Sequence, residues 1–149
     1  IKEINQYLNI SAVQSQYSLI DREIEGNFLN TCNKLGINVF TYGPLAQGLL
    51  TGKYNDQSIF GDNDCRQRLP HFHGEKYNRH LGVIQQVSEI ANKYQVTMSQ
   101  VALRWVIENP FISCAISGIK SIVQIEENIE ALAFKIHSED FEFFQKKTN

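Results

Sequence analysis

Three shortages in this sequence exclude whole classes of protein. Its 149 residues include only three cysteines and three prolines, and no long apolar run. An odd number of widely separated cysteines gives neither a disulfide framework nor a zinc site, so we expect a reducing compartment, the cytoplasm. Apolar runs such as residues 111–116 are too short to cross a bilayer, so we expect no membrane insertion.

Positive charge is sparse as well. Lys and Arg total 14 against 16 Asp and Glu, the net charge is -2, and the cations are scattered along the chain. We therefore expect no nucleic-acid partner, because such proteins carry a basic stripe or patch. With 42% hydrophobic residues, a chain of this length can form one ordinary globular domain with a core.

Short apolar segments alternate with amphipathic ones along the chain. We predict strands near residues 10–14, 37–42 and 112–117, and helices over 22–34, 78–94, 98–108, 121–132 and from 138 onward. Thr97 with Gln100, and Ser121 with Gln124, have the spacing of capping boxes. Strands that alternate with helices in this way predict an α/β fold with a parallel sheet.

Several apolar residues are expected in the core of this fold. Trp105 shares a helical face with other apolar residues and is predicted to be buried. Cys114, inside the third strand, is expected to be a small buried residue. The helix over 121–132 is predicted to bury an apolar stripe made of Ile122, Ile125, Ile129 and Leu132.

The segment after the second strand is the most informative candidate site. Residues 43–78 form an irregular, glycine-rich stretch that is longer than a usual connection, and such loops are commonly functional. Gly43, Gly48 and Gly52 let the backbone approach a ligand closely, and Lys53 adds a positive charge suited to a phosphate.

Polar or aromatic groups also stand where each predicted strand ends. Gln14 ends the first strand, Tyr42 the second, and Ser117 with Gly118 the third. The carboxyl ends of parallel strands meet at one rim, where ligands bind, so the sequence predicts a cofactor site there. Plainer interpretations stay open, because Gln14 can simply finish a strand and Tyr42 can be a core aromatic residue.

Six motifs resemble the C-terminal half of an aldo-keto reductase. They are SAVQ (11–14), QYSLIDR (16–22), YGPLAQGLLTGKY (42–54), RLPHF (68–72), VALRW (101–105) and GIKSIVQIEEN (118–128). They are most similar to the bacterial and potassium-channel β-subunit-like branches. The resemblance implies that residues 1–149 are the C-terminal portion of a (β/α)₈ TIM barrel, with about three parallel strands and flanking helices. It also makes residues 43–78 a loop for cofactor or substrate.

The resemblance assigns cofactor contacts residue by residue. Gln14 would bond the nicotinamide carboxamide, and Tyr42 would stack on the nicotinamide ring so that one face is presented for hydride transfer. The pyrophosphate would be lined by Gly43, Pro44, Leu45, Ala46 and Gln47, with Lys53 and Arg66 closing over it. The adenosine end would meet Gly118, Lys120, Gln124, Glu127 and Asn128.

The cofactor expected from these assignments is NADPH. Lys53 and Lys120 favour it over NADH because the additional 2′-phosphate needs a cation. In one departure, the family usually has serine where Gly43 stands, so backbone N–H groups must replace a hydroxyl at the phosphate. Gln124 has a plainer interpretation as a capping residue, which would leave Glu127 and Asn128 on a solvated face.

No catalytic residue is expected on this chain. The family's catalytic Tyr, Asp, Lys and His lie on barrel strands that would precede Ile1, so the N-terminal catalytic half is absent. The implied activity is NADPH-dependent reduction of an aldehyde or ketone, with the isolated chain inactive. The alternatives are a non-catalytic NADPH-binding regulatory module or an inactive truncated product. Three strands cut from a barrel expose two edges, so we expect self-association or pairing with the missing half.

No metal site is expected either. His71 and His73 form a histidine pair with a single residue between them, but no third ligand accompanies them in the sequence. The pair is therefore interpreted as surface histidines.

Overall fold

The structure of the chain is a computed structural model that describes residues 1–55 and 57–146, with the side chains of 145 and 146 left out. A three-stranded sheet lies at its centre, made of β1 (Ala12–Gln16), β2 (Asn38–Tyr42) and β3 (Cys114–Ile116). The strands lie side by side in the order β1-β2-β3, and both pairings are parallel. The predicted α/β fold with three parallel strands is confirmed.

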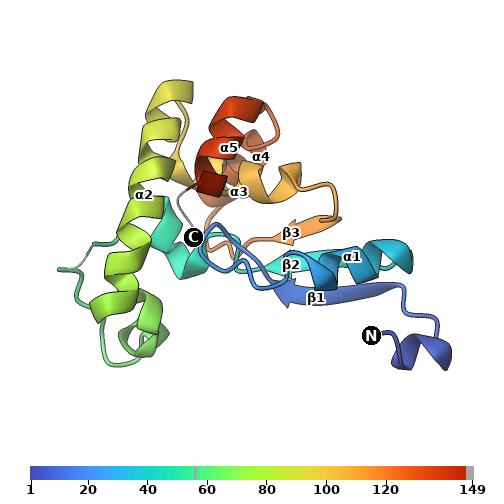
Figure 1. Cartoon of the computed structure of the whole chain (residues 1–149). Helices are drawn as coiled ribbons and strands as arrows, with labels where there is room; N and C mark the ends of the chain where they lie inside the picture. The colour runs from blue at the N-terminus through green and yellow to red at the C-terminus, as the bar shows by residue number, and fades with distance from the viewer. Residues whose placement is uncertain (56, 147–149) are drawn as a thin grey trace.

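Helices join the strands and complete the fold (Figure 1). The α-helices are α1 (Asn27–Lys34), α2 (Gly74–Tyr94), α3 (Met98–Glu108), α4 (Ile122–Glu130) and α5 (Ser138–Lys146). Short 3-10 helices are η1 (Ile4–Gln6), η2 (Ala46–Thr51), η3 (Cys65–Arg68) and η4 (Pro70–Phe72). In Figure 1 the three strand arrows point toward η2 and α2, so the loops after the strands gather at that side. Among the described residues, no helix is both long and apolar enough to cross a membrane.

The two faces of the sheet differ in exposure. Val39 and Thr41 of β2 point to one face and are 1% and 0% exposed, because helices cover that face. Phe40 and Tyr42, which alternate with them, are 38% and 42% exposed. Cys114 pairs with Phe40 in register and is likewise exposed, so the expectation of a buried Cys114 is wrong. Its strand is buried on one face only.

The core lies between the covered face of the sheet and the helices. Trp105 of α3 is 1% exposed, as the apolar spacing predicts, and its ring lies 5.1 Å from that of Tyr17. Thr97 accepts a hydrogen bond from Gln100 N while the Gln100 side chain accepts one from Thr97 N, so the predicted capping box is present. This explains why α3 begins at the predicted residue.

Two predicted helix starts differ from the observed ones. Residues 23–26 form turns, and α1 begins only at Asn27, because Gly26 before it has φ 79 and ψ -114, outside the helical region. The Asp21 side chain accepts a hydrogen bond from Ser18 Oγ (3.1 Å), and its backbone N–H donates to the same hydroxyl (3.1 Å). Conversely, α2 begins at Gly74, four residues before the predicted start at Asn78.

The predicted buried stripe of α4 is wrong. Ile122, Ile129 and Leu132 are 73%, 59% and 66% exposed, and Ile125 is 39% exposed. The reason is that α4 is held against α3 by its other side, where Gln100 Nε2 donates to the Glu127 carbonyl (3.1 Å) and to Glu130 Oε2 (2.8 Å). Helical periodicity identifies an apolar face, but it does not say whether this chain covers that face.

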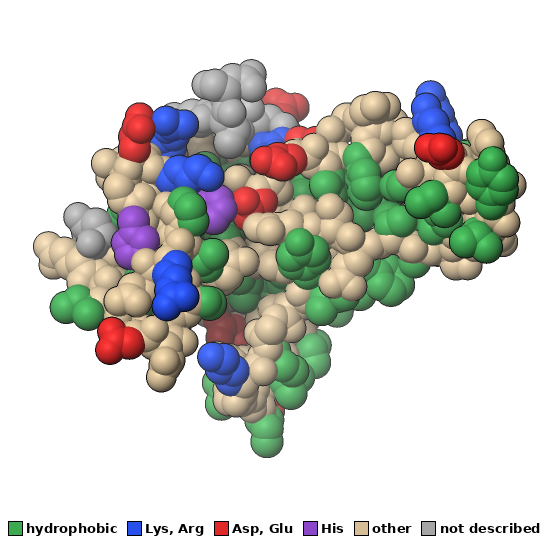
Figure 2. Space-filling view, turned by 90° about the horizontal axis from the view of Figure 1, so that it is seen from below, with side chains coloured by type: hydrophobic (Ala, Val, Ile, Leu, Met, Phe, Trp, Pro, Cys, Tyr) green, Lys and Arg blue, Asp and Glu red, His purple; other side chains and the backbone are tan. Residues whose placement is uncertain are grey.

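A second group of exposed apolar residues lies at the N-terminal end. Ile4, Tyr7 and Leu8 are 55%, 81% and 65% exposed in and after η1. Figure 2 shows apolar side chains gathered at the end of the molecule where Figure 1 places η1. Exposed apolar surface of this extent is typical of a face that meets other protein.

Candidate functional site

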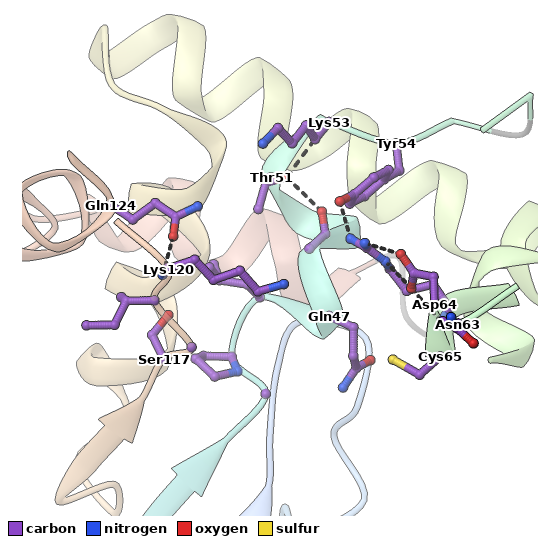
Figure 3. Close-up of a pocket in the computed structure, with 17 residues that line it drawn as sticks. Gln47, Thr51, Lys53, Tyr54, Asn63, Asp64, Cys65, Ser117, Lys120 and Gln124 are labelled. Atoms are coloured by element: carbon purple, nitrogen blue, oxygen red, sulfur yellow. Dashed lines mark hydrogen bonds and ion pairs between the residues drawn. The ribbon is translucent and has the colours of Figure 1, made fainter. Parts of the chain in front are cut away.

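A large cavity lies where β2 and β3 end. Its volume is about 900 Å³, and it is bounded by the loop after β2, by η3, and by the loop between β3 and α4 (Figure 3). Nine of the residues predicted to contact a cofactor line it: Gly43, Pro44, Leu45, Gln47, Lys53, Arg66, Gly118, Lys120 and Gln124. The parallel sheet thus brings segments about 75 residues apart to one rim, as expected for parallel strands.

The backbone of the first wall is shaped by left-handed residues. Gly43, Gly48 and Gly52 have φ of 67, 96 and 74. The neighbouring Ala46 and Gln47 also have positive φ, 48 and 54, although neither is a glycine. Such conformations in non-glycine residues cost energy and cluster at functional loops. No local sequence pattern indicates left-handed backbone at these two positions.

Two lysines enter the cavity from different walls. Lys53 follows η2, whereas Lys120 precedes α4 and extends toward Gln47 and Thr51 (Figure 3). Within the part of the chain that the structure describes, neither ammonium group has a hydrogen bond or an ion pair. Both ammonium groups are therefore available to an anion in the cavity, while the charge of Lys120 also contributes to lowering the pKa of Asp64.

Arg66 is positioned differently, because its guanidinium is already occupied. Its Nε donates to Asp64 Oδ1 (2.8 Å), and its terminal nitrogens donate to Asp64 and to the Tyr54 hydroxyl. The guanidinium also lies over the Tyr54 ring, 4.5 Å from the centroid. Hydrogen bonds from Arg66 lower the pKa of Asp64 to about 2, and Asp64 in turn raises the pKa of Arg66. Arg66 is thus a structural cation at the rim, with its charge compensated by Asp64.

The third wall is formed by the start of α4. The Ser121 hydroxyl accepts a hydrogen bond from Gln124 N (3.3 Å), as its predicted capping role requires. The Gln124 side chain accepts from Lys120 N (2.7 Å) instead of from Ser121 N, so only half of the predicted capping box forms. This bond holds the backbone of Lys120, one of the two lysines that line the cavity.

Five predicted contact residues do not line this cavity. Ala46 is 0% exposed because it packs in the hydrophobic core. The Glu127 carbonyl is taken by Gln100, and Asn128 Nδ2 donates to Ser117 Oγ (3.4 Å). The other two, Gln14 and Tyr42, lie on the open face of the sheet.

Gln14 is not at the end of its strand. β1 continues to Gln16, which pairs with Tyr42, while Gln14 pairs with Phe40. Gln14 and Tyr42 still point to the same face of the sheet. Gln14 shares the face of its partner Phe40, and Tyr42 lies two residues after Phe40 on β2, so it points to that face as well. They therefore lie on the open face of the sheet and not in the wall of the cavity.

Some lining residues were missed in the sequence. Thr51, Tyr54, Asn63, Asp64, Cys65 and Ile119 line the cavity but were not predicted as cofactor contacts. A signal existed for one of them: Asp64 caps η3, accepting from Arg66 N at 3.0 Å, and aspartate before a short helical turn is a common cap. No local sequence pattern indicates that residues 63–65 line the same cavity as the loop after β3.

No group of three His, Cys, Asp or Glu side chains suited to a metal occurs in the described residues. His71 instead lies between His80 (Nδ1 to Nε2, 2.9 Å) and Asp21 (Nε2 to Oδ1, 3.2 Å). His73 Nε2 contacts the Arg66 carbonyl at 3.1 Å. The two histidines thus point to different partners.

Comparison with known proteins identifies the class. The sequence model of the aldo/keto reductase family matches residues 1–149, so the chain belongs to this family. It resembles the glycerol dehydrogenase AKR11B4 from Gluconobacter oxydans, with a TM-score of 0.85 at 22% identity over 97% of this chain and 44% of that structure. The expected partial (β/α)₈ barrel fold is confirmed.

Three relatives make the comparison more specific. Aldo-keto reductase str7 of Strobilurus tenacellus is 34% identical over 88% of this chain and 40% of its own length. The NADH-specific methylglyoxal reductase of Escherichia coli is 31% identical over 94% and 42%. Aldo-keto reductase yakc [NADP(+)] of Schizosaccharomyces pombe is 31% identical over 85% and 38%. The chain spans about two fifths of the length of these relatives.

Proposed function

We propose that this chain binds NADPH in the 900 Å³ cavity and is the cofactor-holding part of an oxidoreductase that reduces aldehydes or ketones. The observation that carries the proposal is a pair of lysines, Lys53 and Lys120, whose ammonium groups make no ion pair and which line different walls at the carboxyl ends of parallel strands. A dinucleotide carries phosphates that need such cations, and this rim is where α/β folds bind ligands.

The residues present fit this cofactor. Gly43 and Gly48, with no side chains, leave the backbone of the first wall open to a pyrophosphate. Lys120, with its backbone held by Gln124, would meet the adenosine phosphate. Gln14 and Tyr42 on the adjoining sheet face would orient the nicotinamide, which supplies a hydride when bound.

The choice between NADPH and NADH is part of the proposal. Of the relatives, one is named as NADH-specific and another as NADP(+)-linked, so family membership leaves both cofactors open. Two lysines without an anionic partner favour the cofactor with the additional phosphate. Binding should therefore be measured with both.

Calorimetric titration of the chain with NADPH and NADH tests this proposal. Replacing Lys120 by Gln removes one charge, and we expect about tenfold weaker NADPH binding, since a charge-assisted hydrogen bond contributes about 1.5–3 kcal/mol. NADH binding should change less. Lys34→Gln is the matched control, because Lys34 is exposed on α1 and does not line the cavity. Equal NADPH affinity in the two variants would contradict the proposal.

We further propose that the isolated chain is inactive and that the activity belongs to a complete barrel. The chain spans about two fifths of its relatives, and the open sheet face with Phe40 and Tyr42 is where the remaining strands would pack. The three free cysteines agree with a cytoplasmic protein. A non-catalytic regulatory module is the alternative, and NADPH turnover with a carbonyl substrate distinguishes the two once the complete barrel is assembled.

A further inference from the structure

His71 and His80 contact each other beside the loop that follows β1. His71 Nδ1 lies 2.9 Å from His80 Nε2, and His71 Nε2 lies 3.2 Å from Asp21 Oδ1. The other Asp21 oxygen accepts a hydrogen bond from the buried Ser18 hydroxyl at 3.1 Å. Side chains from the loop after β1, from η4 and from α2 therefore form one continuous chain of contacts. None of the four lines the 900 Å³ cavity.

The number of protons on the two histidines decides whether their contact holds. A carboxylate only accepts, so His71 Nε2 carries the hydrogen that points to Asp21. With both rings neutral, His71 Nδ1 is an acceptor and His80 Nε2 donates to it. One additional proton is accommodated, because a His71 cation donates from Nδ1 to a neutral His80. A second proton places hydrogens on both facing nitrogens, so the hydrogen bond is lost and two positive rings face each other.

The charges near His80 come from three elements of the fold. Asp21, from the loop after β1, favours a proton on this ring, whereas His71 of η4 and both Lys76 and Arg79 of α2 disfavour it. Burial, followed by the charge of His71, lowers the pKa of His80. The pair therefore takes its second proton only in mild acid, below the ordinary range of histidine.

η4 connects the histidine pair to the wall of the 900 Å³ cavity. Phe72, the residue after His71, is 4% exposed, and its ring centroid lies 5.8 Å from that of Tyr54. The next residue, His73, contacts the Arg66 carbonyl through Nε2 at 3.1 Å. Tyr54 and Arg66 both line the cavity. Three consecutive residues thus join the pair to this wall, so a displacement of η4 reaches it directly.

We propose that His71 and His80 form a pH-sensitive latch, which holds η4 between Asp21 and α2 while the pair carries at most one proton and releases it when both rings are protonated. Release loosens the part of the cavity wall formed by Tyr54 and Arg66. The rest of the chain stays folded, because the latch opens only at η4. The latch acts on the wall itself, whichever ligand the cavity binds.

Hydrogen exchange of backbone amides measures the release. The amides of Phe72 and His73 each donate to a carbonyl three residues earlier, at 3.1 and 3.3 Å, so they report on η4. After correction for the intrinsic exchange rate at each pH, their protection should fall about tenfold between about pH 7.5 and about pH 5, since the open state binds one more proton. The amide of Val101, hydrogen-bonded in the first turn of α3 at 3.1 Å, should remain better protected than both.

Two results in the parent chain would overturn the proposal. One is equal protection of the η4 amides at both pH values. The other is a Val101 amide that exchanges in acid as fast as those of η4, because the whole chain would then be unfolding.

Two matched substitutions locate the effect. The amide of His80→Gln can donate to His71 Nδ1 or accept from it but takes no proton, so the protection of η4 should be equal at both pH values. His73→Gln makes the same change two residues from His71 and leaves the pair intact, so the fall of about tenfold should remain. A fall that persists in His80→Gln, or disappears in His73→Gln, would contradict the latch.

A measurement on the parent chain decides the matter if His80→Gln does not fold. The ring resonances of the histidines are titrated by NMR alongside the exchange experiment. The loss of protection at η4 should follow the second protonation of the His71 and His80 pair. A loss that follows the titration of His73, or of the carboxylates at lower pH, would overturn the proposal.

Discussion

Replacing Gly52 by alanine is the sharpest test of the cavity's first wall. Gly52 closes η2 with φ 74 and ψ 4, immediately before Lys53. An ideal Cβ at this position would lie 2.5 Å from Met98 Sδ, closer than real Cβ atoms come to other heavy atoms. The substitution therefore introduces both backbone strain and a steric clash between η2 and α3.

The expected magnitude follows from these two effects. A left-handed conformation costs alanine about 1–2 kcal/mol more than glycine. Overpacking costs about 1–3 kcal/mol, but methionine is flexible and Met98 is only half-buried, so the lower part of that range applies. We expect Gly52→Ala to lower the free energy of unfolding by about 2–3 kcal/mol.

Urea unfolding followed by Trp105 fluorescence measures this change. Gly82→Ala is the matched control: Gly82 lies inside α2, and a Cβ there would meet no atom within 4 Å. That change should instead stabilise the chain by about 1 kcal/mol, because alanine is the better helix former. In a Met98→Ala background the clash is absent, so Gly52→Ala should cost only the backbone term of about 1–2 kcal/mol relative to Met98→Ala alone. A Gly52→Ala chain as stable as the parent would refute this account of the loop.

Two further predictions concern the pH dependence of stability and the self-association of the chain. The pKa of His80 is lowered mainly by burial and then by the charge of His71; Lys76 and Arg79 lower it further, and Asp21 opposes them. The unfolded chain therefore binds a proton at this histidine more readily than the folded chain does. The free energy of unfolding should decrease as pH falls below about 6.5. Unfolding free energies at pH 8 and pH 5 should differ less in His80→Asn than in the control His137→Asn, and equal differences would contradict this. The exposed stripe of α4 should make the chain scatter light as a species larger than 17.1 kDa. Ile129→Lys should reduce that mass, whereas Ile59→Lys, at a position that is 96% exposed and outside α4, should not. A monomeric parent chain would contradict association through the α4 stripe.

Local sequence signals predicted most elements because their physical causes are local. The Thr97–Gln100 capping box set the start of α3, and alternating apolar segments gave three parallel strands. The start of α1 was missed because it depends on the backbone conformation of Gly26. The end of β1 was missed because pairing with Tyr42 extends the strand to Gln16. Both errors arise where a boundary is decided by conformation or by a distant strand.

Motif order and residue type determined the family and nine of the residues that line the cavity, since a parallel sheet must bring the ends of its strands together. Only the tertiary structure decided which charges stay free. The ammonium groups of Lys53 and Lys120 make no hydrogen bond or ion pair in the described chain, whereas Arg66 is held by Asp64 and Tyr54. It also decided that the isoleucines of α4 face outward. The physical reason is that charge compensation and burial depend on neighbours distant in sequence, and a pattern along one segment cannot specify them.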